Sequence, residues 1–144
     1  MKPFREFIAE LFDKPARWAL TTEREDELKY ESLVNGKILL AVFEEGATNQ
    51  WTLSFTINGD LTTTGGGDEI PIFSTVLDMT ADFIERIDPK SISFDAFKEV
   101  DGRDSRIKLY DRFIKRFASK YGYKLSSKNT VRDLYTDYVL VRKD

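Results

Sequence analysis

The chain has 144 residues, of which 41% are hydrophobic and 13% aromatic, so it can fill the core of one compact domain. It contains no Cys and no His, which excludes a Cys nucleophile, a Ser-His-Asp relay and zinc or iron–sulfur sites with thiolate or imidazole ligands. Any chemistry must come from the remaining polar side chains or from the backbone. We expect no metal site.

The net charge of −3 is unevenly distributed along the chain. Residues 1–70 carry 7 basic and 13 acidic side chains, whereas residues 71–144 carry 15 and 12. Within residues 103–124 the balance is 8 basic to 2 acidic. An acidic protein with such a segment is expected to carry a local basic surface.

The N-terminal sequence carries charges where a signal peptide needs an apolar run, and no stretch approaches the roughly 18–20 apolar residues of a membrane span. We therefore expect a protein that is not secreted and has no membrane partner.

The first 27 residues predict one helix and a connector. Apolar residues at helical spacing predict a short helix over residues 3–13, which Pro15 helps to end. Residues 18–26 show no period and are interpreted as a polar connector.

A strand-rich block follows over residues 28–57. Alternating apolar residues predict strands at 28–34 and 51–57, and the continuous apolar run at 37–43 is typical of a central strand. Asn35-Gly36 and Asn58-Gly59 predict tight turns, and residues 60–64 are a possible short returning strand.

The second half predicts two long helices and three strands. The first helix follows Gly65–Gly67, with Asp68 as N-cap, and ends at Asp88-Pro89. We expect its apolar stripe to consist of Phe73, Val76, Leu77, Thr80, Ile84 and Ile87. Phe83 is expected at the margin of this stripe.

A strand at 91–97, a helix at 105–121 closed by Gly122, and strands at 123–127 and 134–142 complete the chain. Together these elements predict a single α+β domain over residues 1–144, with a mixed, mostly antiparallel sheet flanked by helices and its core at residues 28–142.

The glycines before the first long helix allow two interpretations. Gly65, Gly66 and Gly67 would let a phosphate approach the free N–H groups of a helix N-terminus. They are also compatible with a plain turn, and the following Asp68 and Glu69 would repel a phosphate unless they point away.

The helix at 105–121 carries a basic face, which we interpret as a possible partner-binding surface; its residues are Lys108, Arg112, Lys115, Arg116 and Lys120. Nucleic acid, the phosphates of a CoA-like ligand or an acidic protein would fit such a face. The alternative is a solvated face that the acidic residues 23–27 balance.

The order of elements resembles the GNAT (GCN5-related N-acetyltransferase) fold over residues 28–142. Gly65 and Gly67 match the glycines of that family's pyrophosphate loop, with Thr62 at its Arg/Gln position. Leu109-Tyr110 and Gly122-Tyr123 are similar to its later Leu-Tyr and Gly-Phe pairs.

This resemblance implies GNAT-like topology and acetyl-CoA bound through Thr62 and Gly65–Gly67, with Tyr110 as the acid that protonates the leaving thiolate. Within that interpretation Glu44 or Glu45, at the end of a strand, would act as general base, directly or through water. The alternative for this pair is a charged turn. A buried structural tyrosine remains the alternative for Tyr110.

Three runs also resemble small tailed-phage proteins; they are Gly65–Asp68 with Ile72–Val76, Ser91–Phe94, and Ser105–Arg112. This second resemblance implies a phage-type accessory or binding protein, located in the host cytoplasm or the virion, with a protein or virion component as partner and no certain cofactor.

Three functions therefore remain open. The first is the phage-type accessory or binding protein on a GNAT-like scaffold. The second is an N-acetyltransferase that uses acetyl-CoA. The third is a nucleic-acid-associated protein that uses the basic helix within residues 103–124.

Overall fold

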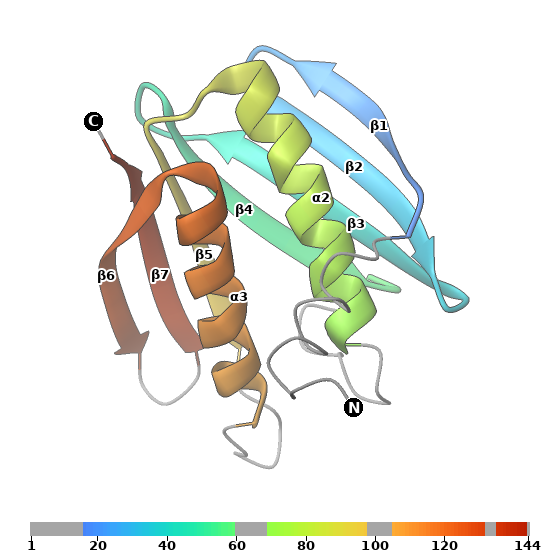
Figure 1. The fold of residues 1–144 in the computed structure, drawn as a ribbon. Helices are drawn as coiled ribbons and strands as arrows, with labels where there is room; N and C mark the ends of the chain where they lie inside the picture. The colour runs from blue at the N-terminus through green and yellow to red at the C-terminus, as the bar shows by residue number, and fades with distance from the viewer. Residues whose placement is uncertain (1–15, 60–68, 98–104, 132–134, 144) are drawn as a thin grey trace.

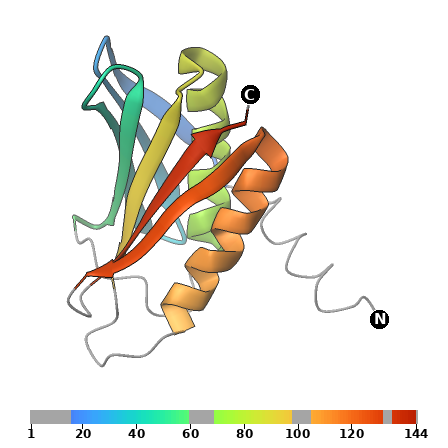
Figure 2. The same ribbon diagram turned by 90° about the vertical axis from the view of Figure 1, so that its left-hand side faces the viewer.

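The computed structural model describes residues 16–59, 69–97, 105–131 and 135–143. They form two layers, a sheet and a pair of helices (Figure 1). Both helices lie on the same face of the sheet, as the turned view in Figure 2 shows. We call the face that these helices leave uncovered the outer face.

The described residues contain two helices, α2 (Glu69–Ile87) and α3 (Ser105–Tyr121). The strands are β1 (Trp18–Arg24), β2 (Glu27–Val34), β3 (Lys37–Glu45), β4 (Gln50–Ile57), β5 (Ser91–Phe97), β6 (Tyr123–Val131) and β7 (Tyr135–Arg142). They form a seven-stranded sheet in the order β1-β2-β3-β4-β5-β7-β6. Only the β4–β5 pair is parallel.

The predicted α+β class with a mixed, mostly antiparallel sheet is confirmed. From β2 to β7 the elements follow the order that the GNAT resemblance implies. The predicted helix at 3–13, the possible strand at 60–64 and the glycines at 65–67 lie outside the described residues.

The predicted connector at residues 18–26 is wrong, because most of it forms the edge strand β1. A β-bulge between Leu20 and Thr22 interrupts the pairing with β2, and a bulge breaks the two-residue alternation by which a strand is recognised.

The other edge strand, β6, also has an irregularity in its pairing, between Leu125 and Ser127. It runs four residues beyond its predicted end at Ser127.

The two predicted Asn-Gly turns are confirmed. Asn35 and Gly36 have φ values of 49° and 80°, and Asn58 and Gly59 have values of 52° and 83°. Because two consecutive positive φ angles match the twist of the flanking strands, the β2–β3 hairpin keeps the register that places Leu28, Tyr30 and Val34 in the core.

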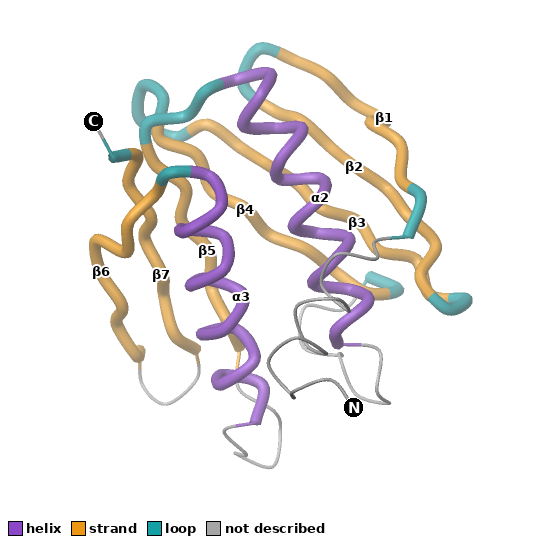
Figure 3. Tube along the Cα trace, viewed as in Figure 1, coloured by secondary structure: helices purple, strands orange, loops and turns teal. Residues whose placement is uncertain are grey.

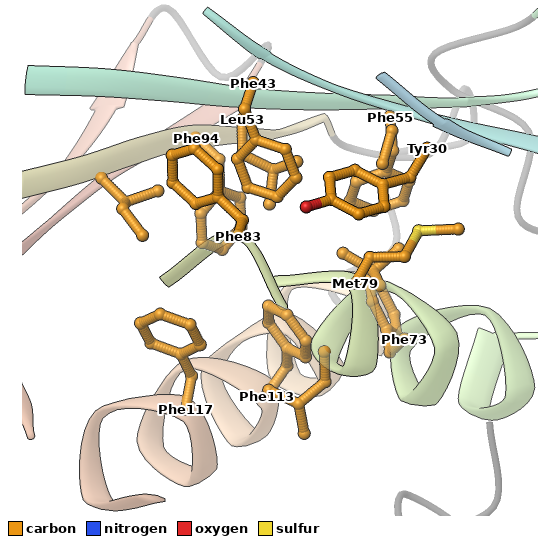
Figure 4. Close-up of a cluster of buried hydrophobic side chains, with 14 of the residues drawn as sticks. Tyr30, Phe43, Leu53, Phe55, Phe73, Met79, Phe83, Phe94, Phe113 and Phe117 are labelled. Atoms are coloured by element: carbon orange, nitrogen blue, oxygen red, sulfur yellow. The ribbon is translucent and has the colours of Figure 1, made fainter. Parts of the chain in front are cut away.

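The core is rich in aromatic side chains, and Phe83 lies at its centre (Figure 4). Its ring stacks on Phe43 of β3 at 4.0 Å between centroids and meets Trp51 of β4 edge-on at 5.1 Å. The prediction that Phe83 is marginal is therefore wrong, whereas Ile84 and Ile87 are only partly buried. The buried line of α2 is rotated toward Ile72, Val76, Met79 and Phe83.

Helix α2 is fastened to β1 and β2 by polar contacts at its solvent margin. Tyr30 Oη donates to Asp82 Oδ2 at 2.8 Å, and Arg86 Nε donates to the same oxygen at 2.6 Å. Trp18 Nε1 donates to Asp78 Oδ2 at 2.6 Å. Burial, together with the Asp82 carboxylate, raises the pKa of Tyr30, so its hydroxyl stays a donor at physiological pH.

Within the described residues, no helix is long and apolar enough to cross a membrane.

The central position of Phe83 predicts a large difference between two truncations on α2. Phe83→Ala should lower the free energy of unfolding by about 3–5 kcal/mol, because it leaves a cavity against Phe43 and Trp51. Ile87→Ala, at a partly buried position, should cost only about 1 kcal/mol. Urea unfolding measures both, and equal costs would contradict the packing described.

The Tyr30–Asp82 hydrogen bond predicts coupling in a double-mutant cycle. Tyr30→Phe and Asp82→Asn should show a coupling energy of about 1–2 kcal/mol, because each removes one partner of a charge-assisted bond. Glu85, exposed on the same helix, provides the matched control. Tyr30→Phe and Glu85→Gln should be additive to within about 0.5 kcal/mol. Additivity in both cycles would argue against the bond.

Candidate functional site

The parallel strands β4 and β5 pair over only a short stretch. Their register covers three residue pairs and ends at Thr52 and Ser93. Beyond these residues β4 stays paired with β3 as far as Ile57, while β5 stays paired with β7 as far as Phe97. The two strands therefore start side by side and diverge, as Figure 1 shows. We call their paired start the closed end and their separated C-terminal ends the open end.

At every second residue of β4, the backbone N–H and C=O groups point toward the gap between β4 and β5. Asn58 N donates to Ile38 O at 2.8 Å, so this even-numbered residue points toward β3. In an antiparallel pair the bonding direction alternates along the strand. The N–H and C=O groups of Phe55 and Ile57 consequently point away from β3, toward β5.

The backbone of β5 faces the divergence in the same way. Ser91 N approaches Asn49 O at 3.4 Å, which fixes the side of β5 that faces β4. By the same alternation, the backbone groups of Asp95 and Phe97 point toward β4. Beyond the three-pair ladder, two polar backbone edges thus face each other.

Both helices begin near the open end. In Figures 1 and 3, α2 at Glu69 and α3 at Ser105 start close to the C-terminal ends of β4 and β5 and run back toward the closed end. A helix N-terminus presents free N–H groups and partial positive charge. The open end therefore brings two polar backbone edges together with two helix N-termini, of which that of α2 begins with the acidic Glu69 and that of α3 has no acidic residue in its first turn.

The closed end is held together by Asn49, in the turn before β4. Its carbonyl accepts from Lys90 N at 3.0 Å, and its Nδ2 donates to Asp88 O at 3.3 Å. Its own N–H donates to Glu45 Oε2 at 2.8 Å. Asn49 has φ of 57°, a left-handed conformation that Asn adopts more readily than most residues. Sequence reasoning missed Asn49 because, unlike Asn35 and Asn58, it is not followed by Gly.

Two side chains from the far end of the chain reinforce this junction. Tyr123 Oη donates to Pro89 O at 2.6 Å, and burial raises the pKa of Tyr123 to about 12, so the hydroxyl keeps its proton. Arg142 forms an ion pair with Asp88 at 2.7 Å. The start of β5 is thus held by the turn before β4 and by side chains of β6 and β7.

The structure places the predicted bases Glu44 and Glu45 at the closed end. Glu45 pairs in register with Trp51, and its carboxylate accepts the Asn49 N–H described above. Glu44 is exposed and lies opposite Thr52 on the outer face. Neither residue lies at the open end.

The other predicted site residues divide into two groups. Thr62, Gly65, Gly66 and Gly67 lie outside the described residues, and for Lys108 and Tyr110 only the backbone, within α3, is described. On the described part of α3, three of the predicted basic residues are exposed and Arg116 is partly buried; the exposed ones are Arg112, Lys115 and Lys120.

Among the described residues, no group of three or more His, Cys, Asp or Glu side chains is arranged to hold a metal ion.

No protein-family model matches the chain, and no curated protein matches its sequence. Solved structures with a similar arrangement include RimL, the ribosomal L7/L12 alpha-N-protein acetyltransferase, in complex with coenzyme A, at 8% identity and a TM-score of 0.48. The match covers 81% of this chain and 63% of RimL. AAC(6')-Ib in complex with paromomycin and acetyl-CoA is 13% identical, with a TM-score of 0.44, and 83% of this chain matches 66% of that one.

A structure from Sphaerobacter thermophilus DSM 20745 described as an acetyltransferase is similar over 97% of this chain and 87% of its own, at 10% identity and a TM-score of 0.48. This chain therefore spans about two thirds of the RimL and AAC(6')-Ib chains and most of the Sphaerobacter chain. The similarity concerns the fold, and the fold assignment rests on the strand order and pairing given above.

The closed-end geometry predicts that Glu45 is structurally important and Glu44 is not. Glu45→Ala should lower the free energy of unfolding by about 1–2 kcal/mol, because it leaves the Asn49 N–H without its carboxylate partner. Glu44→Ala, at an exposed position, should change it by less than about 0.5 kcal/mol. Equal effects in urea unfolding would show that the Glu45–Asn49 bond does not support the junction.

Proposed function

We propose that the protein is an acetyl-CoA-dependent N-acetyltransferase that binds the pantetheine arm of its cofactor between the diverging strands β4 and β5. The observation that carries this proposal is the short parallel ladder, which ends after three pairs while each strand continues with its other neighbour.

The chemistry of the two backbone edges supports a pantetheine ligand. The pantetheine arm is an extended chain with amide groups, which can hydrogen-bond to a strand as an added strand does. Phe55 and Ile57 offer N–H and C=O groups on the β4 side. The N-terminus of α3, which has no acidic residue in its first turn, favours the anionic pyrophosphate near the same end.

The proposed transfer balances as an acyl substitution. The neutral amine attacks the thioester carbonyl, a C–N bond forms, the C–S bond breaks, and the departing thiolate takes up a proton. By the GNAT resemblance this proton comes from Tyr110, which lies in the second turn of α3 and so near the open end. Because Glu44 and Glu45 lie at the closed end, we propose that the amine loses its proton to solvent.

The phage-type accessory interpretation receives no comparable support from the described residues. Its resemblance covers short runs and identifies no surface that a virion component would fit. The acetyltransferase proposal, in contrast, relies on the backbone geometry of two named strands.

Acetyl-CoA binding should be visible at individual amides. At one hundred times its dissociation constant the ligand should raise the free energy of unfolding by about 2.7 kcal/mol. In hydrogen exchange followed by NMR, the amides of Phe55 and Ile57 should gain protection. Those of Ser54 and Thr56, which face β3, serve as internal controls and should change little.

Two outcomes of this experiment would contradict the proposal. Absence of any stabilisation at millimolar acetyl-CoA would exclude the cofactor. Stabilisation without protection at Phe55 and Ile57 would place the ligand elsewhere.

In a purified protein that acetylates a small amine, Tyr110→Phe should lower kcat while leaving the acetyl-CoA dissociation constant nearly unchanged.

A further inference from the structure

The outer face of the sheet is polar on β4 and apolar on part of β2 and β3. On β4 its side chains are those of Thr52, Ser54 and Thr56, as expected where one face of an antiparallel sheet meets water. On β2 and β3 the same face carries Leu33 and Ile38, which are 65% and 57% exposed. Among the described residues these are the most exposed large hydrophobic side chains, so this part of the face leaves apolar surface in water.

Leu33 and Ile38 belong to one contiguous surface. They lie directly opposite each other in the β2–β3 register, so their side chains are neighbours. Leu40, the next outer residue of β3, is only partly buried and extends the same surface. We call Leu33, Ile38 and Leu40 the apolar patch. Contiguous apolar surface on an otherwise polar face indicates a site of contact with another molecule.

Two opposite charges flank the apolar patch on its β1 side. Arg17 and Glu31 line a shallow hollow of about 520 Å³ together with Leu33 and Ile38. The β1–β2 register pairs Ala19 with Glu31, so two residues earlier Arg17 comes opposite Leu33. Arg17 and Glu31 are therefore diagonal neighbours, about 7–8 Å apart between Cα atoms. Both are exposed, and no ion pair joins either of them to another described residue.

This arrangement of charges is complementary to itself. Consider a two-fold axis that lies between two facing outer faces and crosses the line from Arg17 to Glu31. Rotation about this axis exchanges the two positions, so each Arg17 faces the partner's Glu31. The same rotation brings Leu33 and Ile38 of the two copies together. A second copy of this chain thus carries the matching charges and the matching apolar surface.

We propose that two copies of the chain form a dimer through their outer faces, with the apolar patches in contact and two Arg17–Glu31 ion pairs beside them. Removal of Leu33 and Ile38 from water drives the association, and the ion pairs fix the relative orientation of the copies. Both copies use the same surface, so the assembly closes at two. The interface involves β1 to β3 and does not rest on the proposed acetyltransferase activity.

Sedimentation equilibrium of the full chain tests this dimer. We expect a monomer–dimer equilibrium without larger species at protein concentrations up to about 1 mM, which would half-populate even a millimolar dimer. Arg17→Glu places two carboxylates against each other at each flank, and Glu31→Arg places two cations there. Each variant should raise the dimer dissociation constant about tenfold or more, because like charges in an interface repel.

A mixture of the two charge variants gives the decisive measurement. In a heterodimer of Arg17→Glu with Glu31→Arg, one chain carries two acidic and the other two basic side chains at the flanks. Both ion pairs are then restored with reversed sign. The mixture should therefore associate with a dissociation constant close to that of the unmodified chain, although neither variant dimerises well alone.

Two sets of control variants separate this interface from general effects. Glu85→Arg and Lys90→Glu reverse the charge of exposed residues outside the hollow, and neither should change the dissociation constant, alone or mixed. Ile38→Thr should weaken the dimer, whereas Leu125→Thr, at an exposed apolar residue of β6, should not. Circular dichroism should show every variant folded, because all the substituted side chains are exposed.

Three outcomes would overturn the proposal. The first is a chain that stays monomeric at about 1 mM, which would leave the apolar patch to a partner of different sequence. The second is a dimer that Arg17→Glu, Glu31→Arg and Ile38→Thr do not weaken, which would place the interface elsewhere. The third is a mixture of the two charge variants that associates no better than either variant alone. None of these outcomes depends on acetyl-CoA binding.

Discussion

The short parallel ladder between β4 and β5 is the constraint on which the rest of the structure depends. Asn49 joins the starts of the two strands, since its carbonyl and side chain bind the backbone at Asp88 and Lys90. Because β4 is also held by β3 and β5 by β7, the twist of the two halves of the sheet forces the strands apart beyond the junction. The divergence thus follows from hydrogen bonding at one end.

Much of the fold could be predicted from the sequence because local patterns and tertiary packing agree. The alternation at Trp51–Ile57 and the Asn35-Gly36 turn each produced the expected element. Two errors came from features with no local signal. The bulge in β1 disrupts its period, and the central position of Phe83 depends on its stacking with Phe43, which lies far away in the sequence. Periodicity gives the apolar side of a helix, but the neighbouring elements decide which residue lies deepest.

The candidate site was less predictable from the sequence, because it is formed by backbone N–H and C=O groups whose directions depend on how the strands pair. No motif marks the C=O and N–H groups of Phe55 and Ile57, since any residue type supplies them. The carboxylate of Glu45 was noticed for its chemistry, yet it accepts a turn N–H. The basic residues of α3 were visible in the sequence, whereas their separation from the acidic segment at residues 23–27 became apparent only from the sheet order.

The irregularities in β1 and β6 have a consequence for the behaviour of the protein at high concentration. A regular strand at the edge of a sheet offers a row of backbone donors and acceptors to which a strand of another molecule can add. Here both edge strands change register within their length, and β6 also carries exposed Lys124 and Lys128. A second sheet cannot continue the ladder across such breaks, so the fold discourages fibre-like stacking of sheets.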